Sequence, residues 1–401
     1  MQMKFSLLNI TRNKRRSIVC IVSIALSVFG LYFLDGFFSG LISMHRENSI
    51  HSRFGHGQIF TKGYYDQTHA KPWEHWIENP NDVMAKVLEH PEVKQVFPRV
   101  QFFSLLSNGS QSVAGRGLGV VGKDEATFFN KMNIVSGDML RGEEYGIVMG
   151  IGLARALNVK VGDPVTLIGN TIYGSINALD LKVTGIFHIG LKEADDMLFQ
   201  IQLSQAQILL DTEKVEAISL GNKDHLVWNG VESFVEKEFP TLEARSVNVL
   251  DKIWAKNGED FLTALLNIFR LVFLGVISLS IYNSSANTVL ERTRELGMLR
   301  ANGLSGSNLV KFMTIESFIL AIVGALLGVA LTFLGDLVFS QGVPMPPTPG
   351  TNRELPVLLE LNLRDGLIAM GLGISVSVLA SISASLKVMG LPISRALRTM
   401  S

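Results

Sequence analysis

The sequence has no excess of charge of either sign and almost no cysteine. Its 401 residues include 36 lysines and arginines against 36 aspartates and glutamates, so the overall charge gives no attraction toward nucleic acid. The one cysteine, Cys20, cannot form an intrachain disulfide and carries no information about the redox compartment. In contrast, 47% of the residues are hydrophobic and the mean hydropathy is +0.29. With 18% of residues charged, this composition predicts a chain with both lipid-facing and water-facing parts.

Motifs for catalysis and for metal binding are also lacking. There is no G-x-S-x-G elbow, and Cys20 lies in an apolar run, where a thiol is a poor nucleophile. Residues 117–124 come within one residue of a phosphate-binding P-loop, but Asp124 replaces the hydroxyl residue that the motif requires, so we expect a glycine-rich strand and turn. The five histidines of residues 45–75 and the acidic residues of 193–196 lack a tight metal-ligand spacing. The sequence therefore favours a protein that is not an enzyme and holds no cofactor or metal of its own.

Four apolar stretches are long enough to cross a bilayer, which takes roughly 20 helical residues. Charged side chains lie at their edges and not at their centres, because burying an ion in lipid is costly. The predicted spans are Ser17–Phe38, Leu271–Leu290, Ser317–Gly335 and Gly366–Leu386. We interpret the first as an uncleaved anchor, because its apolar core is too long for a signal peptide and no small-x-small cleavage site follows it.

Basic residues are distributed unequally between the two sides of these spans. Twelve lysines and arginines lie in the N-terminal lead-in, in the loop after the second span and in the C-terminal tail, against two in residues 340–365. The positive-inside rule then places both termini in the cytoplasm and the long segment between the first two spans outside. Residues 1–16 have the spacing of a short amphipathic helix on the inner surface, although a polar lead-in whose charges only set the topology fits equally well.

The long segment of residues 46–255 predicts an extracytoplasmic α+β domain. Strand and helix signals alternate in its first and last parts, with a helix start at Asn79 and a helix over 225–238. Short β signals broken by glycine are dense between residues 110 and 212, which predicts an inserted β-rich subdomain within a split βα layer. The fold class is thus an α+β membrane protein with four transmembrane helices and a large extracytoplasmic domain between helices 1 and 2.

The expected division of the chain follows from these elements. It comprises a lead-in (1–16), the first span with its stalk (17–45), the α+β domain (46–255), a stalk with the second span (256–290), a cytoplasmic helix and loop (291–312), the third span (313–339), an outer loop (340–365), the fourth span (366–388) and a cytoplasmic tail (389–401).

Two short motifs belong to the membrane part. Gly324 and Gly328 form a small-xxx-small step in the third span, which serves either close packing within the chain or a contact between two chains. The second motif, residues 291–303, predicts a charged helix of about three turns that continues the second span and ends at Gly303 as a C-cap. A rigid capped helix suits docking into a partner, whereas a solvated inter-span loop would not need one.

The segment 291–303 resembles the E-R-x-x-E-[IL]-G-x-x-[RK]-A-x-G signature of the FtsX-like permeases, the superfamily that includes MacB and the lipoprotein-releasing permeases LolC and LolE. Asn302 differs from the apolar residue usual there. Residues 9–16 and 392–397 resemble the ends of the family's chains, and the order of one span, a large domain and three spans is the family's topology. The matching residues that the resemblance assigns to ATPase coupling are Glu291, Arg292, Glu295, Leu296, Gly297, Leu299, Arg300 and Gly303.

Residues 55–59, 144–148 and 183–187 look most like the LolC/LolE branch, in which the outer domain has porter-like and inserted Sabre parts. In that branch, the permease that recruits the periplasmic carrier has a long hairpin hook. The corresponding stretch here, residues 168–180, is short and has no proline, so this chain departs from the carrier-recruiting pattern.

The resemblance implies a permease subunit of a type VII, mechanotransmission-like ABC complex in the bacterial inner membrane. A separate cytoplasmic ATPase dimer would bind ATP and Mg²⁺, and the other partners would be a second permease chain, membrane lipid, and a periplasmic carrier or adaptor. Release of lipoprotein or another lipophilic substrate from the outer leaflet is the first function that it implies. An efflux or secretion pump and a non-transporting regulator of an envelope hydrolase remain alternatives.

Overall fold

The structure is a computed structural model that describes residues 14–67, 70–142, 145–189, 192–252, 254–291, 305–345 and 356–389. These residues form two compact units. The membrane unit contains residues up to Ser43 together with the chain from Asn257, apart from residues 345–355, and the α+β unit contains residues 44–256. Each unit is described by itself below.

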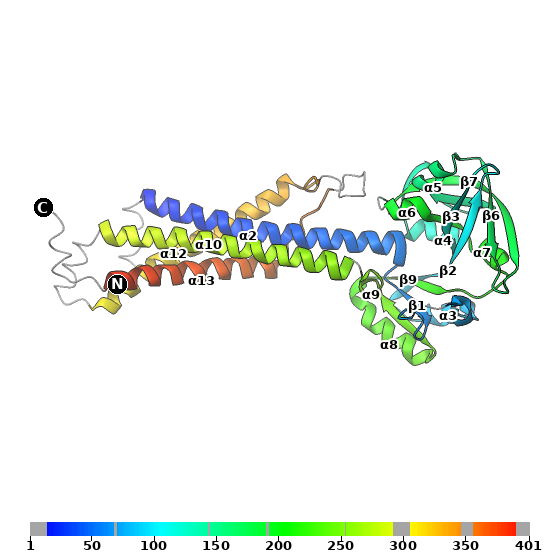
Figure 1. Ribbon diagram of the computed structural model, residues 1–401. Helices are drawn as coiled ribbons and strands as arrows, with labels where there is room; N and C mark the ends of the chain where they lie inside the picture. The colour runs from blue at the N-terminus through cyan, green and yellow to red at the C-terminus, as the bar shows by residue number, and fades with distance from the viewer. Residues whose placement is uncertain are drawn as a thin grey trace. The chain divides into compact units, whose positions relative to one another are not determined.

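Long helices make up the membrane unit. They are α2 (Lys14–Ser49, of which residues 14–43 belong to this unit), α10 (Asp260–Glu291), α12 (Gly306–Val338) and α13 (Leu363–Met389) (Figure 1). Among the described residues, these four helices contain stretches long and apolar enough to cross a membrane. The four predicted spans are therefore present as helices, and the second helix begins about three turns before the predicted span.

Apolar side chains from all four helices meet in one core. Ile24, Val28 and Leu31 of α2 are at most 2% exposed, and they pack with Ile277 of α10 and Ala321 of α12. The α13 helix contributes alanines to the same core. In the membrane, small residues at such contacts let helices approach closely, because lipid supplies no hydrophobic driving force between them.

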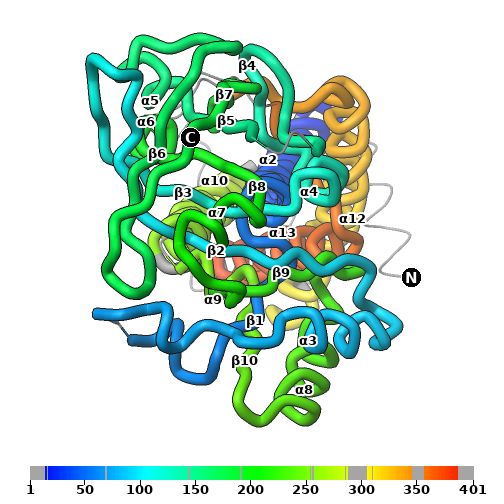
Figure 2. The backbone as a smooth tube through the Cα atoms, turned by 90° about the vertical axis from the view of Figure 1, so that its right-hand side faces the viewer, coloured from blue at the N-terminus to red at the C-terminus, as the bar shows by residue number. Residues whose placement is uncertain are grey.

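A split layer forms the first part of the α+β unit. Its strands run in the order β10 (Leu242–Ser246), β1 (Gly57–Thr61), β9 (Ala217–Asn222) and β2 (Val93–Ser107), and all three pairings are antiparallel (Figure 2). The predicted helix that starts at Asn79 is α3 (Pro80–Val87), and the helix predicted over 225–238 is a short 3-10 turn followed by α8 (Trp228–Glu238).

The strand β2 serves two sheets. Its residues 93–99 pair with β9 of the layer, whereas its residues 100–107 pair with β3 (Ser112–Val120). From β3 the hydrogen bonding continues through β8 (Leu198–Gln202), β5 (Gly146–Gly150), β7 (Ile176–His188) and β6 (Pro164–Asn170), and β6 returns to β2. The β-rich insertion is therefore a closed six-stranded barrel, with β4 (Asn133–Gly137) attached to β7.

Short helices complete the α+β unit. They are η1 (Ile50–Phe54), η2 (Pro72–His75), α4 (Gly122–Phe128), α5 (Ile151–Ala156), α6 (Lys192–Met197), α7 (Leu203–Leu210), η3 (His225–Val227), α9 (Val247–Leu250) and η4 (Trp254–Glu259). The sequence of the β-rich insertion also predicts helices over 152–157 and 204–210, and these are α5 and α7. The helices α4 and α6 were not predicted.

Candidate functional site in the membrane unit

The helix α12 packs against α2 through its two small residues. A Cβ atom added to Gly324 would lie 2.8 Å from Ile24 Cβ, and one added to Gly328 would lie 2.7 Å from the carbonyl oxygen of Ala25. Both distances are shorter than side chains tolerate, so larger residues at these positions would push the helices apart. The small-xxx-small step is thus occupied by a contact within the chain.

A second pair of glycines on α2, which the sequence analysis missed, contacts the segment before α13. A Cβ atom on Gly36 would lie 2.5 Å from a methyl group of Leu361, and one on Gly40 would lie 1.9 Å from the carbonyl oxygen of Leu358. The backbone N–H of Glu360 donates to the carbonyl oxygen of Gly36 at 3.0 Å. The spacing of four residues between these glycines was a signal that could have found this contact.

Asp35 of α2 and Arg270 of α10 form an ion pair in the membrane unit. The Arg270 guanidinium donates to Asp35 Oδ1 from Nε at 3.1 Å and from Nη2 at 2.8 Å, and its Nη1 donates to Asn267 Oδ1 at 3.1 Å. Asp35 is 4% exposed, whereas the Arg270 side chain is 34% exposed. Charges inside spanning helices are expensive and persist where they are paired, so this contact fixes α10 against α2.

Polar side chains make further cross-helix contacts in the core. Cys20 Sγ lies 2.8 Å from Ser284 Oγ, and Ser317 Oγ donates to Ser381 Oγ at 2.8 Å. The first contact joins α2 to α10 and the second joins α12 to α13. Together with the glycine contacts and the ion pair, they make the four helices a specifically packed bundle.

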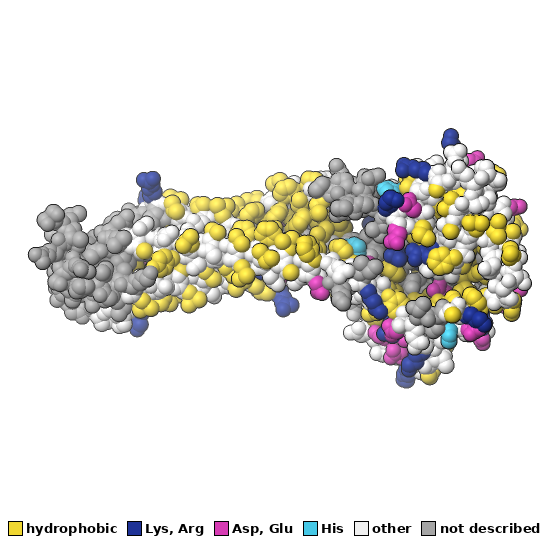
Figure 3. Space-filling model, viewed as in Figure 1, with side chains coloured by type: hydrophobic (Ala, Val, Ile, Leu, Met, Phe, Trp, Pro, Cys, Tyr) yellow, Lys and Arg dark blue, Asp and Glu magenta, His cyan; other side chains and the backbone are white. Residues whose placement is uncertain are grey.

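The outer surface of this bundle is apolar. Figure 3 shows hydrophobic side chains covering the membrane unit, whereas charged side chains of both signs are scattered over the α+β unit. On α10, for example, Phe261, Leu271 and Leu279 are 64%, 71% and 64% exposed. Such a surface needs lipid or another protein to cover it.

The predicted coupling residues fall at the edge of the described chain. Glu291 is the last residue of α10, and Ser305 is the N-cap of α12, where its hydroxyl accepts from the N–H of Asn308. Arg292, Glu295, Leu296, Gly297, Leu299, Arg300 and Gly303 lie outside the described residues. Their role as the ATPase-coupling segment therefore stays a prediction.

The first residues of the P-loop-like segment form a β-strand. Gly117 and Gly119 lie in β3, whose residues 116–120 pair with β8. A Cβ atom on Gly117 would lie 2.5 Å from the ring of Phe102, so glycine is needed there for packing. Lys123 is exposed on α4. The expected glycine-rich strand is confirmed, whereas the residues after it begin α4 at Gly122 in place of the expected turn.

Histidines of the α+β unit have structural roles. His45 stacks on Trp254 with a centroid distance of 3.6 Å and contacts Asp251 at 3.1 Å. The Nδ1 atom of His56 accepts from the backbone N–H of Asn222 at 3.1 Å, and burial lowers the pKa of His56 to about 4. In the part of the chain that the structure describes, no group of three His, Cys, Asp or Glu residues is arranged to hold a metal ion.

Two family models match the chain. The model described as "MacB-like periplasmic core domain" matches residues 17–225, more than half of the chain, and the model described as "FtsX-like permease C-terminal" matches residues 267–393. The second match covers α12, α13, most of α10 and the whole predicted coupling segment.

The chain is also similar to individual proteins. The chain is 25% identical over 338 residues to the lipoprotein-releasing system transmembrane protein LolC of Neisseria meningitidis, covering 79% of this chain and 77% of that protein. It is 21% identical over 282 residues to LolE of Haemophilus influenzae, covering 67% of this chain and 66% of that protein. The crystal structure of the periplasmic region of MacB from Actinobacillus actinomycetemcomitans aligns with a TM-score of 0.37 at 10% identity, covering 50% of this chain and 92% of that one. The family models show that the chain belongs to the FtsX-like and MacB-like family of ABC-transporter permeases.

Proposed function

We propose that the chain is the membrane subunit of an ATP-driven complex that releases lipoprotein, or another lipophilic envelope substrate, from the outer leaflet of the bacterial inner membrane. In this proposal both termini are cytoplasmic, the α+β unit is periplasmic, and its split layer and barrel are the porter-like and Sabre-like parts. The similarity to LolC supports this substrate class, because it extends over 79% of the chain. The similarity to the macrolide exporter MacB of Shewanella covers only 20% of the chain.

The observation that carries the proposal is the unbroken helix α10. Its 32 residues rise about 48 Å at ~1.5 Å per residue, which exceeds the ~30 Å hydrocarbon core of a bilayer. The helix ends at Glu291, the first residue of the coupling signature. A displacement of that signature by an ATPase would therefore act on one end of a rigid rod whose other end projects beyond the lipid.

The ion pair and the glycine contacts connect α10 to the other helices of the membrane unit. Asp35 and Arg270 join α10 to α2, and Gly324 and Gly328 join α2 to α12. Force applied to one helix is thereby shared among several helices. In this proposal ATP is bound and hydrolysed by a separate ATPase dimer, and the exposed apolar face of α10 contacts a second permease chain.

Variants of the coupling segment test the proposal. In the predicted coupling helix, Glu295→Lys would introduce a repulsive charge at the docking surface, which costs several kcal/mol at an interface. Gly297→Pro would break the predicted helix at a local cost of ~3 kcal/mol. We expect both variants to insert normally and to lose either co-purification with the ATPase or ATP-driven loss of an acylated reporter protein from proteoliposomes. The exposed Ser307→Lys on α12 is the matched control and should retain both.

Normal ATPase binding and normal reporter release by both coupling variants would show that the segment does not couple. Normal ATP turnover by the wild-type complex without any loss of the acylated reporter would instead contradict the substrate class and leave the permease assignment in place.

A further inference from the structure

A cavity of about 410 Å³ opens in the α+β unit between the split layer and the barrel. Its walls come from η1, β1 and the turn after β1, from β2 and β9, and from β3 and β8 of the barrel. This volume lies within the range of small-molecule sites, about 300–1,000 Å³. All the described residues that line it belong to the α+β unit.

Three arginines line the cavity, and one of them is fully engaged. The Arg99 guanidinium donates from Nε to Glu125 Oε1 at 2.9 Å, donates to the carbonyl oxygen of Arg53, and lies 3.9 Å from the ring centroid of Phe129. Both Arg99 and Glu125 are buried, so this pair is part of the domain's framework.

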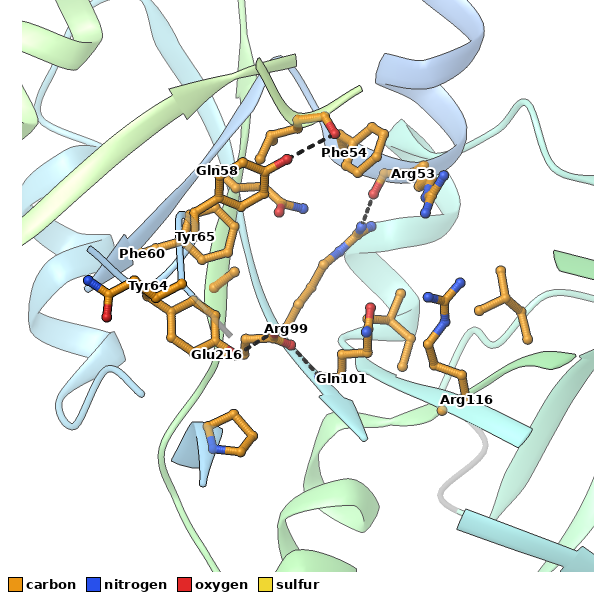
Figure 4. Close-up of a pocket in the computed structure, with 17 residues that line it drawn as sticks. Arg53, Phe54, Gln58, Phe60, Tyr64, Tyr65, Arg99, Gln101, Arg116 and Glu216 are labelled. Atoms are coloured by element: carbon orange, nitrogen blue, oxygen red, sulfur yellow. Dashed lines mark hydrogen bonds between the residues drawn. The ribbon is translucent and has the colours of Figure 1, made fainter. Parts of the chain in front are cut away.

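The guanidinium groups of Arg53 and Arg116 lie on the same side of the cavity (Figure 4). The Nε atom of Arg116 is buried, and in the described part of the chain it has no hydrogen-bond partner. The Arg53 guanidinium contacts the ring of Phe54 at 4.7 Å, and no ion pair to it is found among the described residues. Arg116 is half-buried, whereas Arg53 is exposed to solvent. Burying a polar group without a hydrogen-bond partner is costly, and an anion bound at Arg116 compensates that cost.

Glu216 is the acidic side chain that faces these arginines. Its carboxylate accepts from the hydroxyl of Tyr64 at 3.0 Å and from the backbone N–H of Gln101 at 2.9 Å. Burial raises the pKa of Glu216, whereas these hydrogen bonds and the positive charge of Arg116 act in the opposite direction. Glu125 is thus the partner of Arg99, whereas Glu216 and Asp251 are carboxylates whose charges act on Arg116 and Arg53.

The opposite side of the cavity is aromatic. Figure 4 shows Phe60, Tyr64 and Tyr65 across the cavity from Arg116. The ring of Phe60 lies 5.9 Å from that of Tyr64 and 5.7 Å from that of Tyr65, and the Tyr65 hydroxyl is held by the carbonyl oxygen of Leu250 at 3.2 Å. These contacts fix the rings as a preformed apolar wall.

We propose that this cavity binds an anionic amphiphile, with its phosphate or carboxylate group between Arg53 and Arg116 and its adjoining apolar segment against the wall of Phe60, Tyr64 and Tyr65. Guanidinium groups suit this role because they recognise phosphate and carboxylate oxygens in bidentate fashion. The cavity is a separate ligand site on the α+β unit, beyond the function proposed above. Its occupation needs neither ATP nor a partner chain.

Photo-crosslinking tests the site in the full-length chain, held in nanodiscs of phosphatidylcholine. The probe is dodecyl phosphate with a diazirine in its tail, and labelled peptides are identified by mass spectrometry. We expect labelling of the peptides that contain Phe60 to Tyr65, and we expect it to fall at least tenfold in Arg116→Gln and in Arg53→Gln. Lys123→Gln removes an exposed cation from the same unit and should label like the wild type.

Competition by unlabelled compounds shows which part of the ligand the site recognises. Unlabelled dodecyl phosphate should displace the probe at concentrations at least tenfold lower than inorganic phosphate or dodecanol. Equal competition by inorganic phosphate would show a site for a small anion only, and equal competition by dodecanol would show an apolar site that does not recognise charge. Either result, or labelling that is absent from these peptides, would overturn the proposal.

Thermal stability distinguishes a ligand site from a structural role of the arginine. Because Arg116 has no hydrogen-bond partner at Nε within the described chain, Arg116→Gln should unfold at the same temperature as the wild type or at a higher one. A clear loss of stability in this variant would show that Arg116 is a structural residue, which would refute the inference. Loss of ATPase association, in contrast, would bear only on the function proposed above.

Discussion

Breaking the ion pair between Asp35 and Arg270 should cost a different amount of stability depending on which partner is replaced. Asp35 is almost completely buried, whereas about a third of the Arg270 side chain is exposed. Arg270→Leu therefore leaves a buried carboxylate without its only charged partner among the described residues. Asp35→Leu leaves an arginine whose long side chain can turn toward the membrane surface. We expect the arginine variant to be the less stable of the two, although both remove the same contact.

Removing one partner of a buried ion pair typically costs about 3–5 kcal/mol, because the remaining charge stays uncompensated. Arg270→Leu should approach this range, since the two hydrogen bonds to Asp35 Oδ1 at 2.8 and 3.1 Å are lost together. Replacing both residues by leucine removes the charge altogether, and buried pairs exchanged for apolar residues are often neutral. The double variant should therefore recover most of the loss, with a coupling free energy of about 2–3 kcal/mol.

A thiol-reactive fluorescent dye can measure this unfolding, because Cys20 is the chain's one cysteine and is 3% exposed on α2. Its modification reports the opening of the membrane unit itself. The exposed Arg364→Leu serves as a control for the loss of a positive charge without loss of a pair. Equal unfolding temperatures of Arg270→Leu and Asp35→Leu would contradict the prediction, as would a double variant no more stable than Arg270→Leu.

Three further outcomes are expected. In a cysteine-free background, Ser110→Cys should react with an impermeant maleimide in intact cells and Ser307→Cys only after lysis; the reverse pattern would invert the proposed topology. Gly328→Leu should lower the thermal stability of the membrane unit, because its side chain would meet the α2 backbone; unchanged stability would mean that α2 and α12 do not pack there. Because the folded pKa of His56 lies below the ordinary value of 6.5, its contribution to stability is present above pH 6.5 and is lost toward pH 4. Lowering the pH from 7 to 5 should thus cost about 2 kcal/mol in chemical unfolding of the α+β unit, and His56→Gln should abolish that part of the pH dependence.

Local signals made much of the fold predictable. The four spans could be recognised because charged residues are excluded from their centres, and α3 because Asn79 and Pro80 mark its start. The strand β3 could be separated from a phosphate loop because Asp124 stands where a hydroxyl residue is required. In each case the relevant interaction lies within one element, so a window of adjacent residues contains it.

The remaining features depend on residues far apart in the chain. Asp35 and Arg270 are separated by 235 positions, and neither flanking sequence indicates that the two charges meet. The closure of the barrel depends on the pairing of Leu105 with Ile168, which one strand pattern alone cannot specify. The cavity likewise requires the fold, because Arg53 and Arg116 are brought to one side of it by different elements.

The strand β2 limits how the barrel can be exchanged between members of this family. An inserted module is easiest to exchange between proteins when the chain enters and leaves it through flexible loops. Here the chain leaves the barrel through the residues between α7 and β9, but it enters without a break, because Arg99 pairs with the layer and Val100 with β3. A chimera must therefore transplant the whole of β2 with the barrel, and the residues on β9 that receive it must be transplanted as well.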